Sequence, residues 1–222
     1  TFIREGRHDP AARFHGDYPG LYDRWPQHQV GVLDGQGAVV AAVHCCPLAW
    51  DGDENDLPED GWDWELQTAA EDLAAGRAPR TLGAVSITIH PDLRGRHLSS
   101  DLLHLMKSLG KRDGLTRLIA PVRPNQKAQY PFEPIEEYIQ RTTPEGLSVD
   151  AWIRTHQRIG GRIVGVCTHS MQLVGTVDEW RHWTGVALDS DGLHAIPGGL
   201  APVAVDLTTN RVTYTEPNVW VV

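Results

Sequence analysis

The residues from 94 to 100 have the chemistry of an anion-binding loop. Two arginines flank a glycine in Arg94-Gly95-Arg96, and Ser99 and Ser100 follow within four residues. Where a helix begins, its first backbone N–H groups have no partner within the helix and can bind an anion. Arginine side chains add charged hydrogen bonds to such a site. These residue types and their spacing therefore predict a site for a phosphate-bearing ligand.

The neighbouring segments predict that this loop joins a strand to a helix. Apolar and polar residues alternate through 85–90, which indicates a strand over 81–90 that Pro91 ends. A helix is expected over 98–112, because apolar residues recur there at helical spacing: Leu98, Leu102, Leu105, Met106 and Leu109. A second strand is expected over 115–122. The alternative interpretation is an ordinary strand–helix–strand crossover with a basic turn and no ligand.

The loop resembles the acyl-donor motif of the GNAT acyltransferases, written Arg/Gln-x-x-Gly-x-Gly/Ala. The similar run is Pro91-x-x-Arg94-Gly95-Arg96-x-Leu98-Ser99-x-x-Leu102-Leu103. In that family the loop amides hold the pyrophosphate of coenzyme A, and the preceding strand pairs with the pantetheine arm. The resemblance implies these donor-binding residues: Ile87, Thr88, Ile89, Arg94, Gly95, Arg96, His97, Leu98, Ser99, Ser100 and Asn125. His97 stands where the first motif glycine belongs, so we expect an altered pyrophosphate contact.

The expected elements also follow the order of the GNAT fold over about half the chain. Strands are expected at 29–33, 38–49, 81–90, 115–122, 162–166, 201–207 and 212–222. Helices are expected at 65–76, 98–112, 148–159 and 176–183, with Ser148 and Thr176 as caps of the last two. Short helical turns and loops are expected up to about residue 27. Three segments, 50–64, 124–147 and 168–200, are interpreted as insertions around an acceptor pocket.

The expected fold class is α/β (α+β). We predict a single GNAT-like domain over 1–222, with a mixed central sheet flanked by helices and a splayed donor cleft. Its donor-binding core is expected at about 81–125 and its C-terminal half at about 148–222.

The resemblance implies direct attack of an amine on a thioester, which needs a general acid, a general base and an oxyanion contact. Tyr130 is the expected general acid, because it follows Asn125 as an acidic Tyr often does in the family. Tyr138 and His156 are the rival candidates. His90 is the candidate base, although deprotonation through water needs no single base. The alternative for Tyr130 is a residue that packs under a loop.

The charge of the chain is unevenly distributed. The net charge is −9, which argues against a nucleic-acid partner. Between Asp92 and Lys127, eight Lys or Arg residues stand against three Asp, a local net charge of +5. Such a region suits a phosphorylated donor or an acidic acyl carrier protein. The alternative for Lys107 and Lys111 is a solvated helix face.

An acidic segment lies at 51–65, where eight residues are Asp or Glu. It is either a solvated loop or a lid that attracts a cationic acceptor. Calcium is rejected, because Asp56 and Trp62 replace the glycine and the bidentate glutamate of a calcium loop. The histidines and cysteines have no zinc-ligand spacing, so we expect no metal.

The cysteines and the hydropathy favour the cytoplasm. Cys45, Cys46 and Cys167 cannot form a disulfide framework, which fits a reducing compartment. No run of about 18 apolar residues exists, so we expect no membrane association. The expected function is N-acyltransfer from a pantetheine thioester, either acyl-CoA or an acyl carrier protein, to a small-molecule amine acceptor. The alternative is a GNAT-fold ligand-binding module that has lost catalysis.

Overall fold

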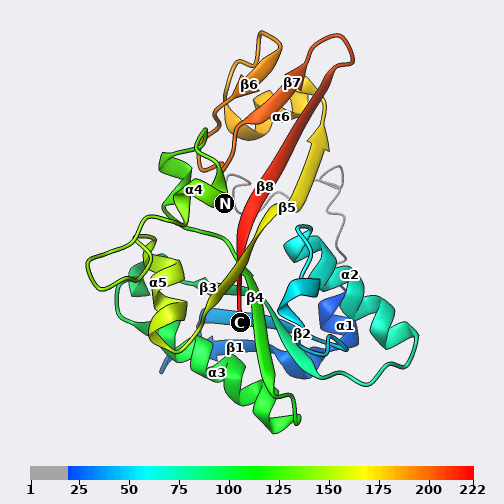
Figure 1. The fold of residues 1–222 in the computed structure, drawn as a ribbon, viewed down its shortest axis with the longest axis vertical. Helices are drawn as coiled ribbons and strands as arrows, with labels where there is room; N and C mark the ends of the chain where they lie inside the picture. The colour runs from blue at the N-terminus through cyan, green and yellow to red at the C-terminus, as the bar shows by residue number, and fades with distance from the viewer. Residues whose placement is uncertain (1–19) are drawn as a thin grey trace.

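The computed structural model describes residues 20–222, and Figure 1 shows their arrangement. Eight strands of this part of the chain form one sheet in the order β1-β2-β3-β4-β8-β7-β6, with β5 paired to β8. They are β1 (Gln29–Leu33), β2 (Val39–Leu48), β3 (Thr81–Ile89), β4 (Arg117–Val122), β5 (Ile163–Gly175), β6 (Gly192–His194), β7 (Val203–Asp206) and β8 (Arg211–Val221). The expected mixed sheet of an α/β fold is therefore confirmed. The predictions for the residues before 20, namely the N-terminal turns and the start of the 1–222 domain, lie outside the described residues.

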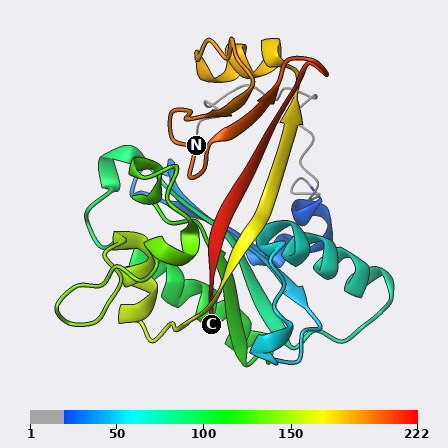
Figure 2. The ribbon, with the colours of Figure 1, turned by 45° about the horizontal axis from the view of Figure 1, so that its top comes forward.

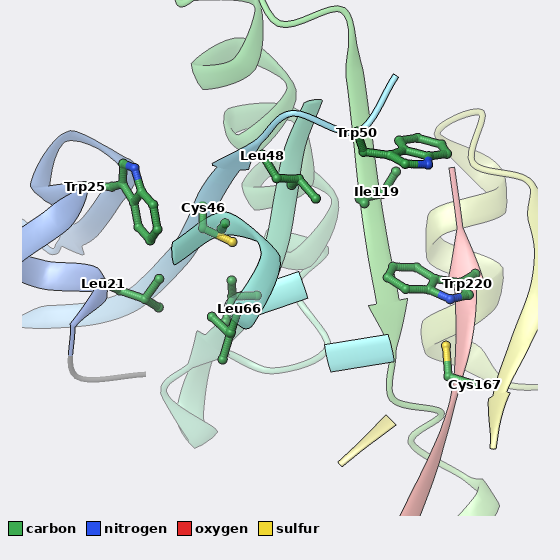
Figure 3. Close-up of a cluster of buried hydrophobic side chains, with 11 residues drawn as sticks. Leu21, Trp25, Cys46, Leu48, Trp50, Leu66, Ile119, Cys167 and Trp220 are labelled. Atoms are coloured by element: carbon green, nitrogen blue, oxygen red, sulfur yellow. The ribbon is translucent and has the colours of Figure 1, made fainter. Parts of the chain in front are cut away.

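Helices cover both faces of the sheet. They are α1 (Leu21–Arg24), α2 (Gly61–Ala74), α3 (Leu98–Arg112), α4 (Ile135–Tyr138), α5 (Ala151–Arg158) and α6 (Val177–Thr184), with four 3-10 turns, η1 (Pro26–His28), η2 (Glu54–Asp56), η3 (Pro91–Leu93) and η4 (Lys127–Gln129). One core joins α1 and α2 to the sheet through Leu21, Leu66 and Trp220 (Figure 3). Separate cores pack α3 and α5 against the sheet. The sheet therefore has an α1/α2 face and an α3/α5 face.

The sheet splits between its two parallel neighbours. β3 and β4 pair only over three residues, Thr81–Gly83 with Arg117–Ile119. Beyond this point β3 continues along β2, whereas Ala120–Val122 of β4 pair with β8. The predicted splayed cleft is thus confirmed, and it opens beside the second half of β3.

The helix at 61–74 begins four residues earlier than predicted. Gly61 lies so close to β5 that a Cβ there would stand 2.4 Å from Ser170 Oγ, and its φ is +36°. Only glycine fits this approach, which allows Trp62 N to donate to Ser170 Oγ at 2.9 Å. The last part of the acidic segment is therefore helix α2 rather than loop.

The cap of α5 is also different from the prediction. Asp150, not Ser148, is the N-cap residue, and its carboxylate accepts from the N–H groups of Trp152 and Ile153. Ser148 Oγ instead accepts from Asp150 N at 3.1 Å. The capping prediction for Thr176 on α6 is confirmed, because Thr176 and Glu179 form a reciprocal capping box.

A long β-ribbon replaces much of the predicted insertion at 168–200. β5 runs to Gly175 instead of ending at 166, and it pairs with β8 on both sides of a bulge at Cys167–Met171. The two strands extend together into a lobe that carries α6, β6 and β7 (Figures 1 and 2). This lobe has its own apolar core around Trp180 and Tyr214. The bulge interrupts the alternation of the sequence, so the strand was predicted to end there.

Candidate active site

A cavity of about 650 Å³ fills the split in the sheet. Its walls come from β3 and β4 and from both faces of the sheet. The α3/α5 face contributes Leu103, Met106, Trp152 and His156, and the opposite side contributes Trp62, Met171, Glu216 and Asn218. The cavity therefore passes through the sheet, so two molecules that enter from opposite faces can meet at β3.

A bulge in β3 lies at this meeting point. Cys45 of β2 pairs with Ala84 and His44 with Ser86, which leaves Val85 without a partner residue in β2. The indole of Trp62 donates to the Val85 carbonyl oxygen at 3.0 Å. Ala84, Val85 and Ser86 all line the cavity, so the bulge forms part of its wall, a place where bulges commonly occur beside active sites.

The basic loop borders the cavity on its α3 side. Arg94 lines the cavity, while Gly95, Arg96 and His97 are exposed beside it. His97 precedes α3 with φ 61°, ψ 5°, the left-handed conformation that normally favours glycine. No side chain caps the N-terminus of α3, and Ser100 N donates to His97 O at 3.0 Å, so the N–H groups of Leu98 and Ser99 are the ones that can bind an anion there. The His97 found at the glycine position thus keeps the backbone conformation that a glycine would adopt.

The other predicted donor residues divide into two groups. Ile87 and Asn125 line the cavity together with Arg94. Thr88 is exposed, and Ile89 packs against the core between β3 and α3. Leu98, Ser99 and Ser100 form the first turn of α3 and are half-buried.

The far end of the cavity holds a polar cluster that sequence reasoning did not identify. Glu216 Oε1 accepts from Arg123 Nε at 2.9 Å, and its Oε2 accepts from Tyr214 Oη at 2.8 Å. Asn218 Nδ2 donates to Ser170 Oγ at 2.8 Å. The available signal was Glu216 and Asn218 next to the apolar end of the C-terminal strand, because such polar residues are rarely buried without a partner.

Comparison with known proteins agrees with this architecture. No protein-family model matches the chain. An arginine N-acetyltransferase, avaD, of Aspergillus versicolor is 34% identical over 197 residues, which cover 80% of this chain and 66% of that protein. The loading GNATL domain of CurA from Lyngbya majuscula superimposes with a TM-score of 0.54 at 16% identity, covering 90% of this chain and 83% of that one. The chain belongs to the GNAT superfamily.

A further GNAT structure resembles the chain more weakly. The GphF GNAT-like decarboxylase in complex with isobutyryl-CoA has a TM-score of 0.49 at 20% identity, covering 68% of this chain and 73% of that one. The present chain spans 66% of the length of the avaD enzyme, just under two thirds.

The two residues expected to transfer protons in this GNAT chain lie away from the cavity. Tyr130 does not line the cavity. The residue is 42% exposed, and its ring lies against Arg141, whose guanidinium carbon is 4.2 Å from the ring centroid. His90 is exposed at the start of η3, where Nδ1 is 3.7 Å from Asp92. Of the rivals, Tyr138 is buried and donates to Asp150 Oδ2 at 2.9 Å, and burial raises its pKa.

His156 is the rival that lines the cavity. Its side chain is buried at the α5 side of the split, against the ring of Trp152 at 4.5 Å. Nε2 is buried and makes no hydrogen bond. Burial, together with the nearby charge of Lys107, lowers the pKa of His156 to about 4, so the imidazole is neutral at pH 7.

The metal-ligand candidates, the acidic segment and the cysteines do not contribute to the cavity. Within residues 20–222, no group of three His, Cys, Asp or Glu side chains is arranged to hold a metal ion. No carboxylate of the 51–65 segment lines the cavity, and Glu54 pairs instead with Arg162 at 2.6 Å. The three cysteines are buried free thiols. None of the described helices is long and apolar enough to cross a membrane.

Proposed function

We propose that this GNAT chain is an N-acetyltransferase that moves an acetyl group from acetyl-CoA to an amine of an amino acid such as arginine. The observation that carries the proposal is the cavity that crosses the split sheet, with the open first turn of α3 and Arg94 at one end. The arginine N-acetyltransferase of Aspergillus versicolor, at 34% identity, supports the acceptor class.

The donor is proposed to bind on the α3 side. The pyrophosphate of coenzyme A would meet the first-turn amides of Leu98 and Ser99 and the hydroxyl groups of Ser99 and Ser100, with Arg94 supplying charged hydrogen bonds. The pantetheine arm would run through the split along Ile87, toward the bulge at Val85. A bound thioester supplies an already activated carbonyl group, so the chain has mainly to align the amine and handle the protons.

Free coenzyme A is the proposed donor, and an acyl carrier protein is the alternative. Four of the eight basic side chains of residues 92–127 contact parts of the chain outside this segment: Lys107 with Ile159 O, Arg117 with Gly52 O, Arg123 with Glu216, and Lys127 with Tyr130 O and Leu200 O. Six of the eight are nevertheless exposed, so the basic surface by itself suits either donor.

His156 is proposed as the group that moves protons, in place of Tyr130 and His90. It lines the cavity, its Nε2 has no protein partner, and a neutral imidazole can accept a proton or donate a hydrogen bond. The route of the acceptor would be from the Trp62 side, so that its amine meets the thioester at β3.

The donor site is tested by comparing two neighbouring arginines. Arg94→Ala should weaken CoA binding by about 1–3 kcal/mol, because a charged hydrogen bond to phosphate is lost. Arg96→Ala should weaken it less, because Arg96 does not line the cavity. Calorimetry with CoA measures both, and equal affinities for wild type and Arg94→Ala would contradict the proposed donor site.

Catalysis is tested separately from binding. Thiol release from acetyl-CoA in the presence of L-arginine and other amines should depend on the amine. CoA binding without thiol release across the amine panel would favour the ligand-binding module instead.

A further inference from the structure

The polar cluster at the far end of the cavity carries both signs of charge side by side. Arg123 follows β4 and Glu216 lies on β8, and both line the cavity. Glu216 is 4% exposed, and its two carboxylate oxygens accept from Arg123 Nε and Tyr214 Oη. Arg123 Nη2 donates to Gly198 O at 2.8 Å, whereas Nη1 makes no hydrogen bond to a described residue. Arg123 therefore has N–H donors on Nη1, next to the cavity, that are available to a ligand.

Asn218 adds an unpaired acceptor to the same wall. It lies two residues from Glu216 on β8, so both side chains point to the same face of the strand. The side chain is 3% exposed and lines the cavity, and its Nδ2 is fixed by Ser170 Oγ at 2.8 Å. This bond orients Oδ1, which is buried and has no hydrogen-bond partner. A buried carbonyl oxygen without a partner is costly, so a ligand N–H at this point would be favoured.

The three groups match the head of an α-amino acid. Such a molecule carries a carboxylate and an ammonium on one carbon atom. A guanidinium binds carboxylates through its planar fork, while a carboxylate and an amide oxygen together accept from an ammonium. Arg123 and Glu216 are in direct contact, so their opposite charges are separated by about the distance between the two charges of a zwitterion.

We infer that Arg123, Glu216 and Asn218 form the acceptor-recognition site, and that it selects acceptors with a free α-carboxylate. Arg123 Nη1 binds the carboxylate, and Glu216 with Asn218 Oδ1 accepts hydrogen bonds from the α-nitrogen. This nitrogen binds as the ammonium and attacks the thioester carbonyl as the neutral amine, after it has lost one proton to His156, directly or through water; the thiolate of coenzyme A then leaves. The inference rests on the proposed function, in that the acceptor is an amino acid. It adds which end of the acceptor is read and by which residues.

The test is a binding measurement that needs no turnover. Calorimetry in the presence of CoA compares L-arginine with L-arginine methyl ester, in which the carboxylate is masked and the ammonium is kept. Wild type should bind L-arginine at least about tenfold more tightly than the ester, the value of one charged hydrogen bond. Arg123→Gln should abolish this preference by weakening only L-arginine. Equal affinities for both ligands in wild type, or a preference retained in Arg123→Gln, would overturn the inference.

Two further variants separate recognition from folding. Arg123→Gln leaves Glu216 without its guanidinium, so Arg123→Gln/Glu216→Gln provides a neutral amide pair that should fold and should likewise show no preference. Arg80→Gln, an exposed arginine outside the cavity, should retain the wild-type preference. If Arg123→Gln weakens both ligands equally, the pair is only structural and the inference is wrong. Failure of thiol release with intact carboxylate selection would count against the proposed acetyl transfer and not against this site.

Discussion

At the scale of single residues, burial separates the candidates for proton transfer. Tyr130 is exposed, but its ring lies against Arg141 and outside the cavity. The hydroxyl of Tyr138 is buried and donates to Asp150. His156 alone among the four candidates both lines the cavity and has a ring nitrogen without a partner. The chemistry that a residue type can perform therefore depends here on which side chain the fold leaves unpaired.

His156→Gln should lower the turnover number by about 10²-fold or more, because positioned acid–base groups contribute factors of this size. Tyr130→Phe, which removes the hydroxyl of the residue favoured by sequence, should change it little. Steady-state thiol release with acetyl-CoA and L-arginine measures both. A large loss of turnover in Tyr130→Phe, together with an active His156→Gln, would contradict the role of His156 and support Tyr130 as the general acid.

At the scale of elements, Asp150 organises the entry to α5. Its buried carboxylate caps the helix and also accepts from Gln126 N at 2.8 Å and from Tyr138 Oη at 2.9 Å. One side chain thus joins α5, α4 and the segment after β4. Because α5 carries His156 and Trp152, this junction fixes one wall of the cavity.

Asp150→Ala should destabilise the protein by about 2–4 kcal/mol, since it removes a helix cap and leaves buried donors without an acceptor. Ser148→Ala should cost about 1 kcal/mol or less, because Ser148 Oγ accepts only from Asp150 N. Urea unfolding at pH 7 measures the free energy of unfolding of each variant. Equal losses in the two variants would show that the cap assignment is wrong.

At the scale of the whole molecule, two buried ionisable groups oppose each other across the sheet. Glu65 of α2 is fully buried, neither carboxylate oxygen has a hydrogen-bond partner, and desolvation raises its pKa well above the ordinary value. His156 lies on the other face with its pKa lowered to about 4. Burial therefore disfavours the charged form of both groups, raising the pKa of the Glu65 carboxyl and lowering that of the His156 imidazole.

Each group makes the free energy of unfolding depend on pH, and the two terms have opposite sign. The pKa of His156 is lowered in the folded protein, so below about pH 6.5 the unfolded chain binds a proton that the folded protein binds only near pH 4, which removes about 3 kcal/mol. The pKa of Glu65 is raised, so above about pH 4.3 the unfolded chain releases a proton that the folded protein releases only at higher pH, and stability declines by at most about 1.4 kcal/mol per pH unit. The two terms oppose each other between about pH 4.3 and 6.5, and the Glu65 term alone lowers stability above that range. Urea unfolding from pH 4 to 9 measures the profile.

Single variants separate the two terms. Glu65→Gln should remove the decline above about pH 6.5 and reveal the acidic decline caused by His156. His156→Gln should remove the acidic term, so that stability declines with rising pH from about pH 4.3. Glu71→Gln on α2 and His104→Gln on α3 replace exposed residues and should leave the profile unchanged. A decline above about pH 6.5 that is the same in Glu65→Gln as in wild type would contradict the raised pKa of Glu65.

The sequence by itself determined the donor half of the molecule. The strand at 81–89, the basic loop and the helix from Leu98 were all predicted at nearly their observed bounds. Thr176 was also predicted as the cap of its helix, because a cap involves residues only three positions apart; the reciprocal bond from Glu179 was not predicted. These features depend on alternation, helical spacing and hydrogen bonds between sequence neighbours, which a single chain segment contains.

Only the tertiary structure brings together the residues of the proposed acceptor site and points to His156 as the proposed catalytic residue. Arg123, Ser170 and Asn218 lie far apart in the sequence and meet because β4 and β5 both pair with β8. The choice of His156 over Tyr130 likewise follows from where α5 packs against the split sheet. Burial and the loss of hydrogen-bond partners are properties of packed surroundings, so no local pattern of residues reports them.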